Sequence, residues 1–194
     1  MLTSEQIKQA AKDLHTAEKE RRQIAAISLQ HTDMNMDDAY AIQKNWVDMK
    51  LAEGREVIGY KVGLTSRAMQ MTMHIDEPDY GTLLDDMLIE DGADIEAARF
   101  CDPRIEVELA FILKDKLEGA DITIFDVLNA TDYVIPALEL IAARSYRIDP
   151  ERGQCRHHHG RASHKANGVG PALGGCDALS QWRDGRNRFG GRCA

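Results

Sequence analysis

The sequence lacks the surplus of basic residues that nucleic-acid binding needs. Of its 194 residues, 24 are lysine or arginine and 32 are aspartate or glutamate, so the formal net charge is -8. Proteins that bind phosphate backbones use clustered lysine and arginine, so this charge argues against a nucleic-acid partner. The chain is nevertheless long enough to bury a core and fold as one domain without disulfides or structural zinc.

A membrane-spanning run and a signal peptide are lacking as well. Residues 1–22 are charged throughout and have no apolar core, and no later run is long enough to cross a bilayer. We therefore expect a cytoplasmic protein with no membrane partner. The four cysteines, Cys101, Cys155, Cys176 and Cys193, form no CxxC pair, so the sequence predicts neither a zinc site nor a disulfide framework.

The start of the chain, by contrast, has the periodicity of helices. Thr3 and Gln6 have the spacing of a capping box, and the apolar residues that follow recur at helical intervals, which predicts one long helix that ends before His31. A second helix is predicted between Asn35, a good N-cap, and Gly54, a common terminator. These two helices are expected to form a hairpin.

The central part of the chain has the composition of strands. VIGYKVGL at 57–64 is rich in β-branched residues and glycine, and RIEVELAFIL at 104–113 alternates before it becomes apolar. Thr123 can cap a short helix over IFDVLNA, and VIPALELI at 134–141 follows as a strand that Pro136 restricts to an edge or a bulge. The predicted fold class is therefore α+β.

Glu106 and Glu108 are the first candidates for chemistry. Residues two apart in a strand project from the same face, so the two carboxylates lie side by side and repel each other unless a cation lies between them. Carboxylate oxygens suit magnesium or manganese, and Glu139 in the last predicted strand could supply a third ligand. The alternative is that both glutamates face solvent while Ile105 and Val107 face the core, and alternation alone favours this alternative.

Two further residues are candidates for proton transfer. Lys61 lies between apolar neighbours in the first strand, where a lysine can act as an acid or a base, although a lysine that extends to solvent is the commoner case. Asp79 follows Pro78 and can simply stabilise a turn. Three consecutive histidines at 157–159 are not expected to bind metal, because consecutive residues do not share a face of a strand or helix.

Four longer segments follow one another along the chain: GYKVGLTS, EPDYGTLLDDM, PRIEVELAFIL and NATDYVIPALELI. In this order and spacing they resemble the hydratase branch of the fumarylacetoacetate hydrolase superfamily, over about residues 1–152. The resemblance implies a helical N-terminal region over 1–55, a mixed β-sheet roll over 56–152, and assembly into homo-oligomers. It also implies a hydro-lyase activity in the bacterial breakdown of 4-hydroxyphenylacetate through homoprotocatechuate.

The resemblance assigns a place to each candidate residue. Glu106, Glu108 and Glu139 stand where the family has its magnesium ligands, and Lys61 and Asp79 stand where it has groups near the reacting carbons. The implied reaction is the hydration of 2-oxohept-4-ene-1,7-dioate to 4-hydroxy-2-oxoheptanedioate. A 2-hydroxypentadienoate hydratase and a 4-oxalocrotonate decarboxylase are the related alternatives.

The implied substrate, a small 2-oxo dicarboxylic acid, carries two negative charges. An acidic protein needs local positive charge to bind it, which the metal, Lys61 and Arg104 could provide, and Arg104 is chosen for its proximity to the glutamates alone. A hydrolase of the same superfamily would need a water-activating base, for which His74 is a weak candidate because it is isolated in the sequence. The other class of function is a non-catalytic binding subunit.

Residues 153–194 do not continue the resemblance and have the arginine- and glycine-rich composition of a disordered tail. Read one nucleotide downstream, codons for 170–177 permit DLRWAAAM, and those for 178–194 permit LSRNGEMVETGLAAGVL, which resemble the family's continuation. We hypothesise that the reading frame slips between Gly153 and His164 and that the chain is truncated as a result, which makes an inactive remnant a further interpretation. The alternative is a genuine divergent tail.

Overall fold

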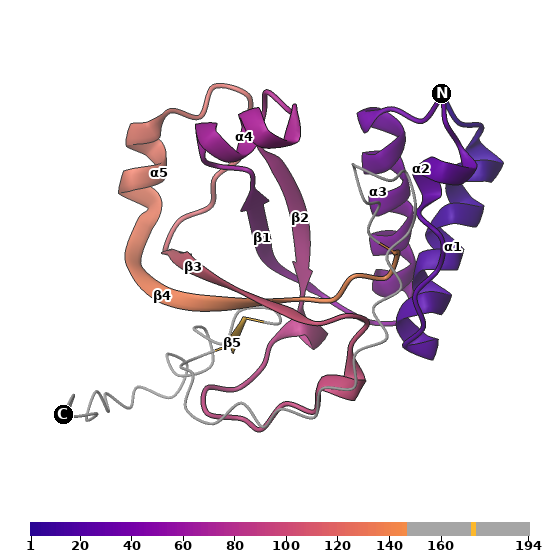
Figure 1. Ribbon diagram of the computed structural model, residues 1–194. Coiled ribbons are helices and arrows are strands. Elements are labelled where there is room, and N and C mark those ends of the chain that lie inside the picture. The colour runs from indigo at the N-terminus through magenta and orange to yellow at the C-terminus, as the bar shows by residue number, and fades with distance from the viewer. Residues whose placement is uncertain (147–171, 174–194) are drawn as a thin grey trace. The chain divides into compact units, whose positions relative to one another are not determined.

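The computed structural model describes residues 1–146 and 172–173, which belong to two units (Figure 1). The first unit comprises Met1–Asp86, Ile95–Arg104 and the described part of Ile141–Lys165. The second comprises Met87–Asp94, Ile105–Leu140 and the described part of Ala166–Ala194. None of the helices within the described residues combines the length and the apolarity needed to cross a membrane.

The two main helices of the first unit begin where the sequence predicts. α1 spans Ser4–Glu20 behind the capping box that Thr3 makes with the third residue of the helix. α3 spans Met36–Ala52, and the Asn35 side chain accepts a hydrogen bond from a backbone N–H in its first turn. Gly54 follows the end of α3 with a φ of 87°, a left-handed conformation that glycine adopts without strain.

The predicted extension of the first helix to just before His31 is wrong. Arg21 adopts a left-handed backbone with a φ of 53°, and the Arg22 N–H donates to the Ala17 carbonyl at 3.0 Å. These bonds satisfy the last carbonyls of α1 without continuing the helix. The apolar periodicity that follows belongs in part to a separate single turn, α2, which spans Ile27–Gln30.

A network of charged side chains fastens α1 to α3. Lys50 donates to the Glu18 carboxylate at 3.1 Å and to the Asp86 carboxylate at 2.6 Å. Glu18 also accepts a hydrogen bond from the Trp46 indole at 3.2 Å and lies 3.5 Å from the Arg144 guanidinium, which stacks 4.3 Å from the centre of the Trp46 ring. The segment that follows the last long strand is thereby joined to both helices.

The first unit also contains an antiparallel pair of strands. β1 spans Val57–Gly63, as predicted, and β2 spans Asp79–Leu84, with the helix α4, Arg67–Met73, between them in sequence. Asp79 is therefore the first residue of a strand rather than part of the predicted turn. Tyr80 of β2 stacks on Tyr40 of α3, with ring centroids 4.6 Å apart. Two short 3-10 helices, Asp85–Met87 and Ala97–Arg99, follow β2 in sequence.

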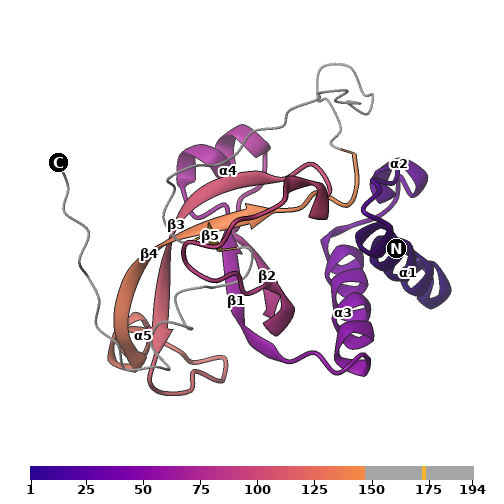
Figure 2. The ribbon, with the colours of Figure 1, turned by 90° about the horizontal axis from the view of Figure 1, so that it is seen from below.

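The second unit is built on a three-stranded sheet in the order β3-β4-β5 (Figures 1 and 2). β3 spans Arg104–Leu113 and β4 spans Thr131–Ile141, both close to the predicted bounds, and α5, Ile124–Ala130, connects them behind its predicted cap, Thr123. β5, Ala172–Leu173, runs parallel to β4. The α+β class, with a helical N-terminal region followed by a mixed sheet, is confirmed.

The apolar face of β3 is more exposed to solvent than the sequence predicts. Ile105 and Val107 are 51% and 83% exposed, and Leu109 and Phe111 on the same face are also exposed. Glu108, on the other face, is half-buried. The expectation that Ile105 and Val107 point into the core is therefore wrong for the described residues, whereas Glu106 is exposed as that alternative expected.

The predictions for the tail fall almost entirely outside the described residues. Cys155, Cys176, Cys193 and the three histidines at 157–159 all lie there, as does the position of the hypothesised frame slip. Cys101 is described, and it is a buried free cysteine.

Candidate metal centre

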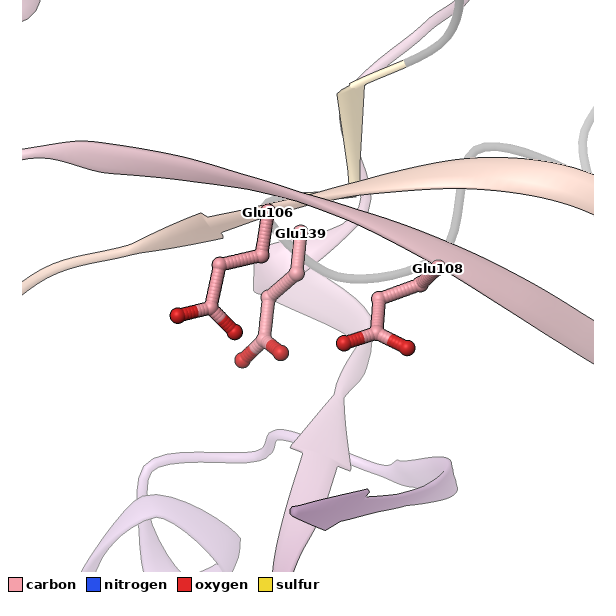
Figure 3. Close-up of side chains that lie close together, drawn as sticks. All are labelled: Glu106, Glu108 and Glu139. Atoms are coloured by element: carbon pink, nitrogen blue, oxygen red, sulfur yellow. The ribbon is translucent and has the colours of Figure 1, made fainter. Parts of the chain in front are cut away.

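Three carboxylates converge on one side of the sheet in the second unit. Glu106 and Glu108 extend from β3 and Glu139 extends from β4, with their side chains directed toward one another (Figure 3). One carboxylate oxygen from each residue lies within 4.8 Å of the other two. Among the described residues, this is the group of acidic, histidine or cysteine side chains with a spacing that could hold a metal ion.

The backbone explains why these three residues meet. Glu106 and Glu108 are two positions apart in a strand, so they share a face. The Lys114 N–H donates to the Ala130 carbonyl at 2.8 Å near one end of the β3–β4 pair, and Glu139 lies beside Glu106 near the other. Pairing of later β3 residues with earlier β4 residues means that the strands run antiparallel, and Glu139 projects from the same face.

The cluster concentrates negative charge. Glu106 is exposed, and Glu108 and Glu139 are half-buried. At the spacing of these carboxylates, each pair of charges repels by about 1 to 3 kcal/mol, depending on whether water or protein dominates the dielectric. A bound divalent cation would replace this repulsion with attraction, so the centre is electrostatically prepared for one.

The donor set selects the kind of cation. All three groups offer carboxylate oxygens, which suit hard cations such as magnesium, calcium or manganese rather than cations that prefer sulfur or imidazole. Three carboxylates leave coordination positions for water or for oxygen atoms of a substrate. The residues therefore fit a divalent metal of this class.

The two predicted proton-transfer residues lie in the first unit, on the β1–β2 pair. The register places Lys61 opposite Gly81 and Gly63 opposite Asp79, so both side chains project from the same face of the pair. Asp79 Oδ1 is buried and accepts no hydrogen bond from the described part of the chain. An open, buried acceptor on a carboxylate is uncommon and calls for a functional explanation.

The remaining two candidates have structural roles in the first unit. The Arg104 guanidinium lies 3.4 Å from the Asp102 carboxylate, so part of its charge is already balanced. His74 ends α4 in a left-handed conformation with a φ of 55°, and its backbone N–H donates to carbonyls of that helix. Its position is therefore explained by helix termination rather than by a role as a base.

The glycines opposite Lys61 and Asp79 are the feature that the sequence analysis missed. A Cβ atom at Gly63 would lie 2.1 Å from Asp79 Oδ1, and one at Gly81 would lie 3.1 Å from the Lys61 Cγ. The signal was present in the alternation of glycine with Lys61 along the strand, but the register that joins each glycine to its partner comes only from the structure.

Comparisons with known proteins find similar sequences for most of the chain. No family model matches the chain. The 2-oxo-hept-4-ene-1,7-dioate hydratase of Escherichia coli is 56% identical over 165 residues, covering 85% of this chain and 62% of that protein. The 2-keto-4-pentenoate hydratase of Paraburkholderia xenovorans is 40% identical over 143 residues, covering 74% of this chain and 53% of that protein.

A solved structure extends the comparison to the fold. The 4-oxalocrotonate decarboxylase of Pseudomonas putida G7, complexed with magnesium and adipate, matches with a TM-score of 0.71 and 34% sequence identity. The match covers 75% of this chain and 55% of that chain. A second structure of that enzyme is complexed with calcium and acetate. This chain thus spans between about half and about 62% of the length of these proteins.

Proposed function

We propose that this chain belongs to the hydratase and decarboxylase branch of the fumarylacetoacetate hydrolase superfamily, holds a divalent cation between Glu106, Glu108 and Glu139 and hydrates a 2-oxo-alkenedioate. The similarity to a hydratase and to a decarboxylase structure supports the proposal. The observation that carries the proposal is the convergence of the three carboxylates within 4.8 Å. The proposed ion is magnesium, with manganese as the alternative that the same oxygen donors accept.

The proposed substrate is 2-oxohept-4-ene-1,7-dioate and the product is 4-hydroxy-2-oxoheptanedioate. Support comes from the difference in identity between the two kinds of hydratase, 56% for the heptenedioate enzyme and 40% for the pentenoate enzyme. A decarboxylase of the 4-oxalocrotonate type is the second candidate, because a structure of that enzyme matches this fold at 34% identity. Either activity would serve the breakdown of aromatic compounds.

The proposed chemistry divides between the cation and the chain. A bound cation would supply Lewis acidity toward the carboxylate and 2-oxo oxygens of the substrate. Lys61 and Asp79 are the proposed proton-transfer groups, since moving the double bond toward the oxo group needs one proton removed and another added before water attacks carbon 4. Asp79 offers a buried acceptor oxygen for that purpose, and Lys61 offers a cationic donor.

Charge balance supports the same assignment. The chain has a net charge of -8 and would repel a dianion at long range. The cation would reverse the sign of the charge at the carboxylate cluster, and Lys61 adds a positive group. Arg104 stays a proposed contact for the distal carboxylate, although it would have to share its charge with Asp102.

This chain matches only part of the length of its relatives, so turnover by this chain is a separate proposal from metal binding. It covers 62% of the Escherichia coli hydratase. A binding subunit or an inactive remnant that retains the carboxylates is the alternative, and the exposed apolar face of β3 favours it because that face lacks a packing partner within the described residues. A homo-oligomer is the proposed assembly in either case.

The first experiment separates metal binding from turnover. Magnesium binding to the full chain is measured by calorimetry, with Mn²⁺ as a paramagnetic probe, for the native chain and for the double variant Glu106→Gln, Glu108→Gln. Asp132→Asn is the matched control, because Asp132 is an exposed carboxylate on β4. We expect the double variant to lose binding and the control to keep it; equal binding by all three would exclude the proposed centre.

Formation of 4-hydroxy-2-oxoheptanedioate from 2-oxohept-4-ene-1,7-dioate is then followed by liquid chromatography, with and without magnesium. Magnesium-dependent turnover that disappears in the double variant would support the hydratase. Metal binding without turnover, together with release of carbon dioxide from 4-oxalocrotonate, would support the decarboxylase. Metal binding with neither activity would favour the non-catalytic alternative.

A further inference from the structure

One face of the β1–β2 pair carries an alternation of glycines and functional side chains. Along β1 this face presents Gly59, Lys61 and Gly63, and the residues opposite them on β2 are Leu83, Gly81 and Asp79. Lys61 and Asp79 are therefore each paired with a glycine, and they are diagonal neighbours. The arrangement is reciprocal: each strand contributes one functional side chain and one glycine.

The glycines are required for space and not for backbone conformation. The glycines of the described residues with a positive φ are Gly54, Gly92 and Gly119, and neither Gly63 nor Gly81 is among them. A strand gains stability from a residue with a side chain, since glycine in a strand interior loses more backbone entropy on folding. Three glycines lie in this short pair of strands, and at two of them, Gly63 and Gly81, an added Cβ atom would come too close to a side chain of the other strand.

The side chains of Lys61 and Asp79 occupy that space. Asp79 Oδ1 would be 2.1 Å from a Cβ atom at Gly63, and Asp79 Cγ would be 3.2 Å from it. Cγ, Cδ and Cε of Lys61 would lie 3.1, 3.4 and 3.7 Å from a Cβ atom at Gly81. The carboxylate and the lysine stem thus each lie flat over the α-carbon of the glycine on the other strand.

The other face of β2 is fixed independently. Tyr80, which alternates with Asp79 and Gly81, stacks on Tyr40 of α3 at 4.6 Å. This stack holds β2 in one orientation, so the face with the glycines cannot turn toward α3. The stack therefore fixes which face of β2 carries Asp79 and Gly81.

We propose that Gly63 and Gly81 are positioning residues that keep this face clear, so that the Asp79 carboxylate and the Lys61 stem lie over the opposite strand as adjoining groups. The inference deepens the proposed function, because Lys61 and Asp79 are the proton-transfer groups of that function. Gly63 and Gly81 would thus orient the side chains of Asp79 and Lys61, which are the proposed proton-transfer groups.

Gly63→Ala and Gly81→Ala are the test variants in the full chain, and Gly59→Ala is the matched control. Gly59 lies on the same face of the same strand, but a Cβ atom there would meet Leu83 Cδ1 at 4.0 Å, an ordinary contact. Each variant is treated with a lysine reagent and, separately, with a carbodiimide and an amine, and the labelled peptides are quantified by mass spectrometry. We expect severalfold faster labelling of Asp79 in Gly63→Ala and of Lys61 in Gly81→Ala, with both rates unchanged in the control.

A double-mutant cycle covers the case in which Gly63→Ala alone does not fold. If the added methyl group clashes only with the Asp79 carboxylate, then Gly63→Ala in an Asp79→Ala background restores the urea midpoint of Asp79→Ala. Gly63→Ala with Lys61→Ala should show no such recovery. Additive effects of the 63 and 79 substitutions, or labelling rates equal to those of the native chain, would overturn the proposal.

Two further readouts distinguish this inference from the proposed function. Mn²⁺ affinity should be the same in all three glycine variants, because none of these positions belongs to the carboxylate cluster. Where the native chain turns over, Gly63→Ala and Gly81→Ala should lower kcat more than they raise KM, and Gly59→Ala should change neither. A native chain without metal binding or turnover would contradict the proposed function and leave the labelling result to decide the role of the glycines.

Discussion

The pKa of Lys50 shows how neighbouring side chains determine the charge of a buried residue in this protein. Burial disfavours the charged ammonium, but hydrogen bonds to Asp86 and Glu18 outweigh burial and raise the pKa of Lys50 above its ordinary value of 10.5. The side chain is only 6% exposed, so the two carboxylates replace the water that it has lost. This residue joins α3 to α1 and to the 3-10 helix Asp85–Met87 that follows β2.

Lys50→Met should therefore lower the free energy of unfolding by about 2 kcal/mol, less than for a fully buried pair because Glu18 and Asp86 are partly exposed and keep other partners. Urea denaturation followed by the far-ultraviolet circular dichroism of the helices measures the change. Lys44→Met is the control, since Lys44 is an exposed lysine of the same helix that forms an ion pair with Asp48, the residue one turn further along. An equal effect of the two substitutions would contradict the role of burial.

The pH dependence of the same variant has a defined sign. A folded-state pKa above 10.5 means that the contribution of Lys50 to stability is complete below that pH and is lost as the pH rises through the folded value. The native chain and Lys50→Met should therefore differ by the full amount at about pH 8 and by less above about pH 11. If the difference in unfolding free energy between the two chains grew with pH, the stabilising role of the Lys50 ammonium would be contradicted.

At the scale of residues, the sequence identified the three glutamates but not the way they face. Alternation of Glu106 and Glu108 with Ile105 and Val107 is compatible with either face being inward. In the structure Glu108 is half-buried, while Glu106 and the two apolar residues are exposed. The resemblance to a family supplied the choice. Period-two patterns give relative orientation only, because the partner that covers a face lies far away in the sequence.

At the scale of elements, starts were easier to predict than ends. Thr3, Asn35 and Thr123 each cap a helix as expected, because the hydrogen bond to the first turn is local in sequence. The end of α1 was missed, since no glycine marks it and Arg21 adopts the left-handed conformation instead. Glu18, near the end of α1, pairs with Arg144, which is far away in the sequence. Such a contact cannot be predicted from the local spacing of residues.

Arg21→Gly should stabilise the first unit by up to about 1 kcal/mol, because glycine adopts a left-handed backbone without the penalty of a side chain, partly offset by the greater freedom of glycine in the unfolded chain. Thermal denaturation of the helical signal reports the change. Arg22→Gly serves as the comparison. Arg22 has no positive φ, so the same substitution there should lower the stability of the first unit. Destabilisation by Arg21→Gly would mean that its side chain contributes more than its backbone costs.

At the scale of the whole molecule, the second unit exposes several large apolar side chains. Val107, Leu109 and Phe111 on β3 are 83%, 64% and 54% exposed, and Phe125 and Leu128 of α5 are 71% and 60% exposed. Where exposed apolar side chains form one contiguous patch, they mark an interaction site or an aggregation hazard.

We expect the chain to bind the dye ANS, and the double variant Val107→Thr, Leu109→Thr to bind less of it and to remain soluble at higher concentration. Its thermal midpoint should change little, because substitutions of exposed residues usually alter stability by less than about 0.5 kcal/mol. Titration with ANS and light scattering measure the two effects. A large loss of stability in the variant would show that these side chains are covered in solution, by a second copy or by another part of the chain.

The proposed frame slip is tested on the gene rather than on the protein. Sequencing both strands across codons 150–165 should show a single-nucleotide change relative to a frame that continues into DLRWAAAM. An engineered gene with the frame restored should then yield a chain with weaker ANS binding. An unaltered frame on both strands would falsify the slip and leave the tail as a divergent sequence.

The carboxylate centre also has a consequence for how long the second unit persists. Glu106 and Glu108 belong to one strand and Glu139 to another, and the chain between them passes through α5. An ion held by both strands would act as a reversible cross-link that closes this loop, stabilising the unit by about 2.7 kcal/mol at a hundredfold excess over the dissociation constant. Amide hydrogens of β3 and β4 should then exchange more slowly in magnesium than in a chelator, so that cellular magnesium would set the lifetime of this unit against proteases.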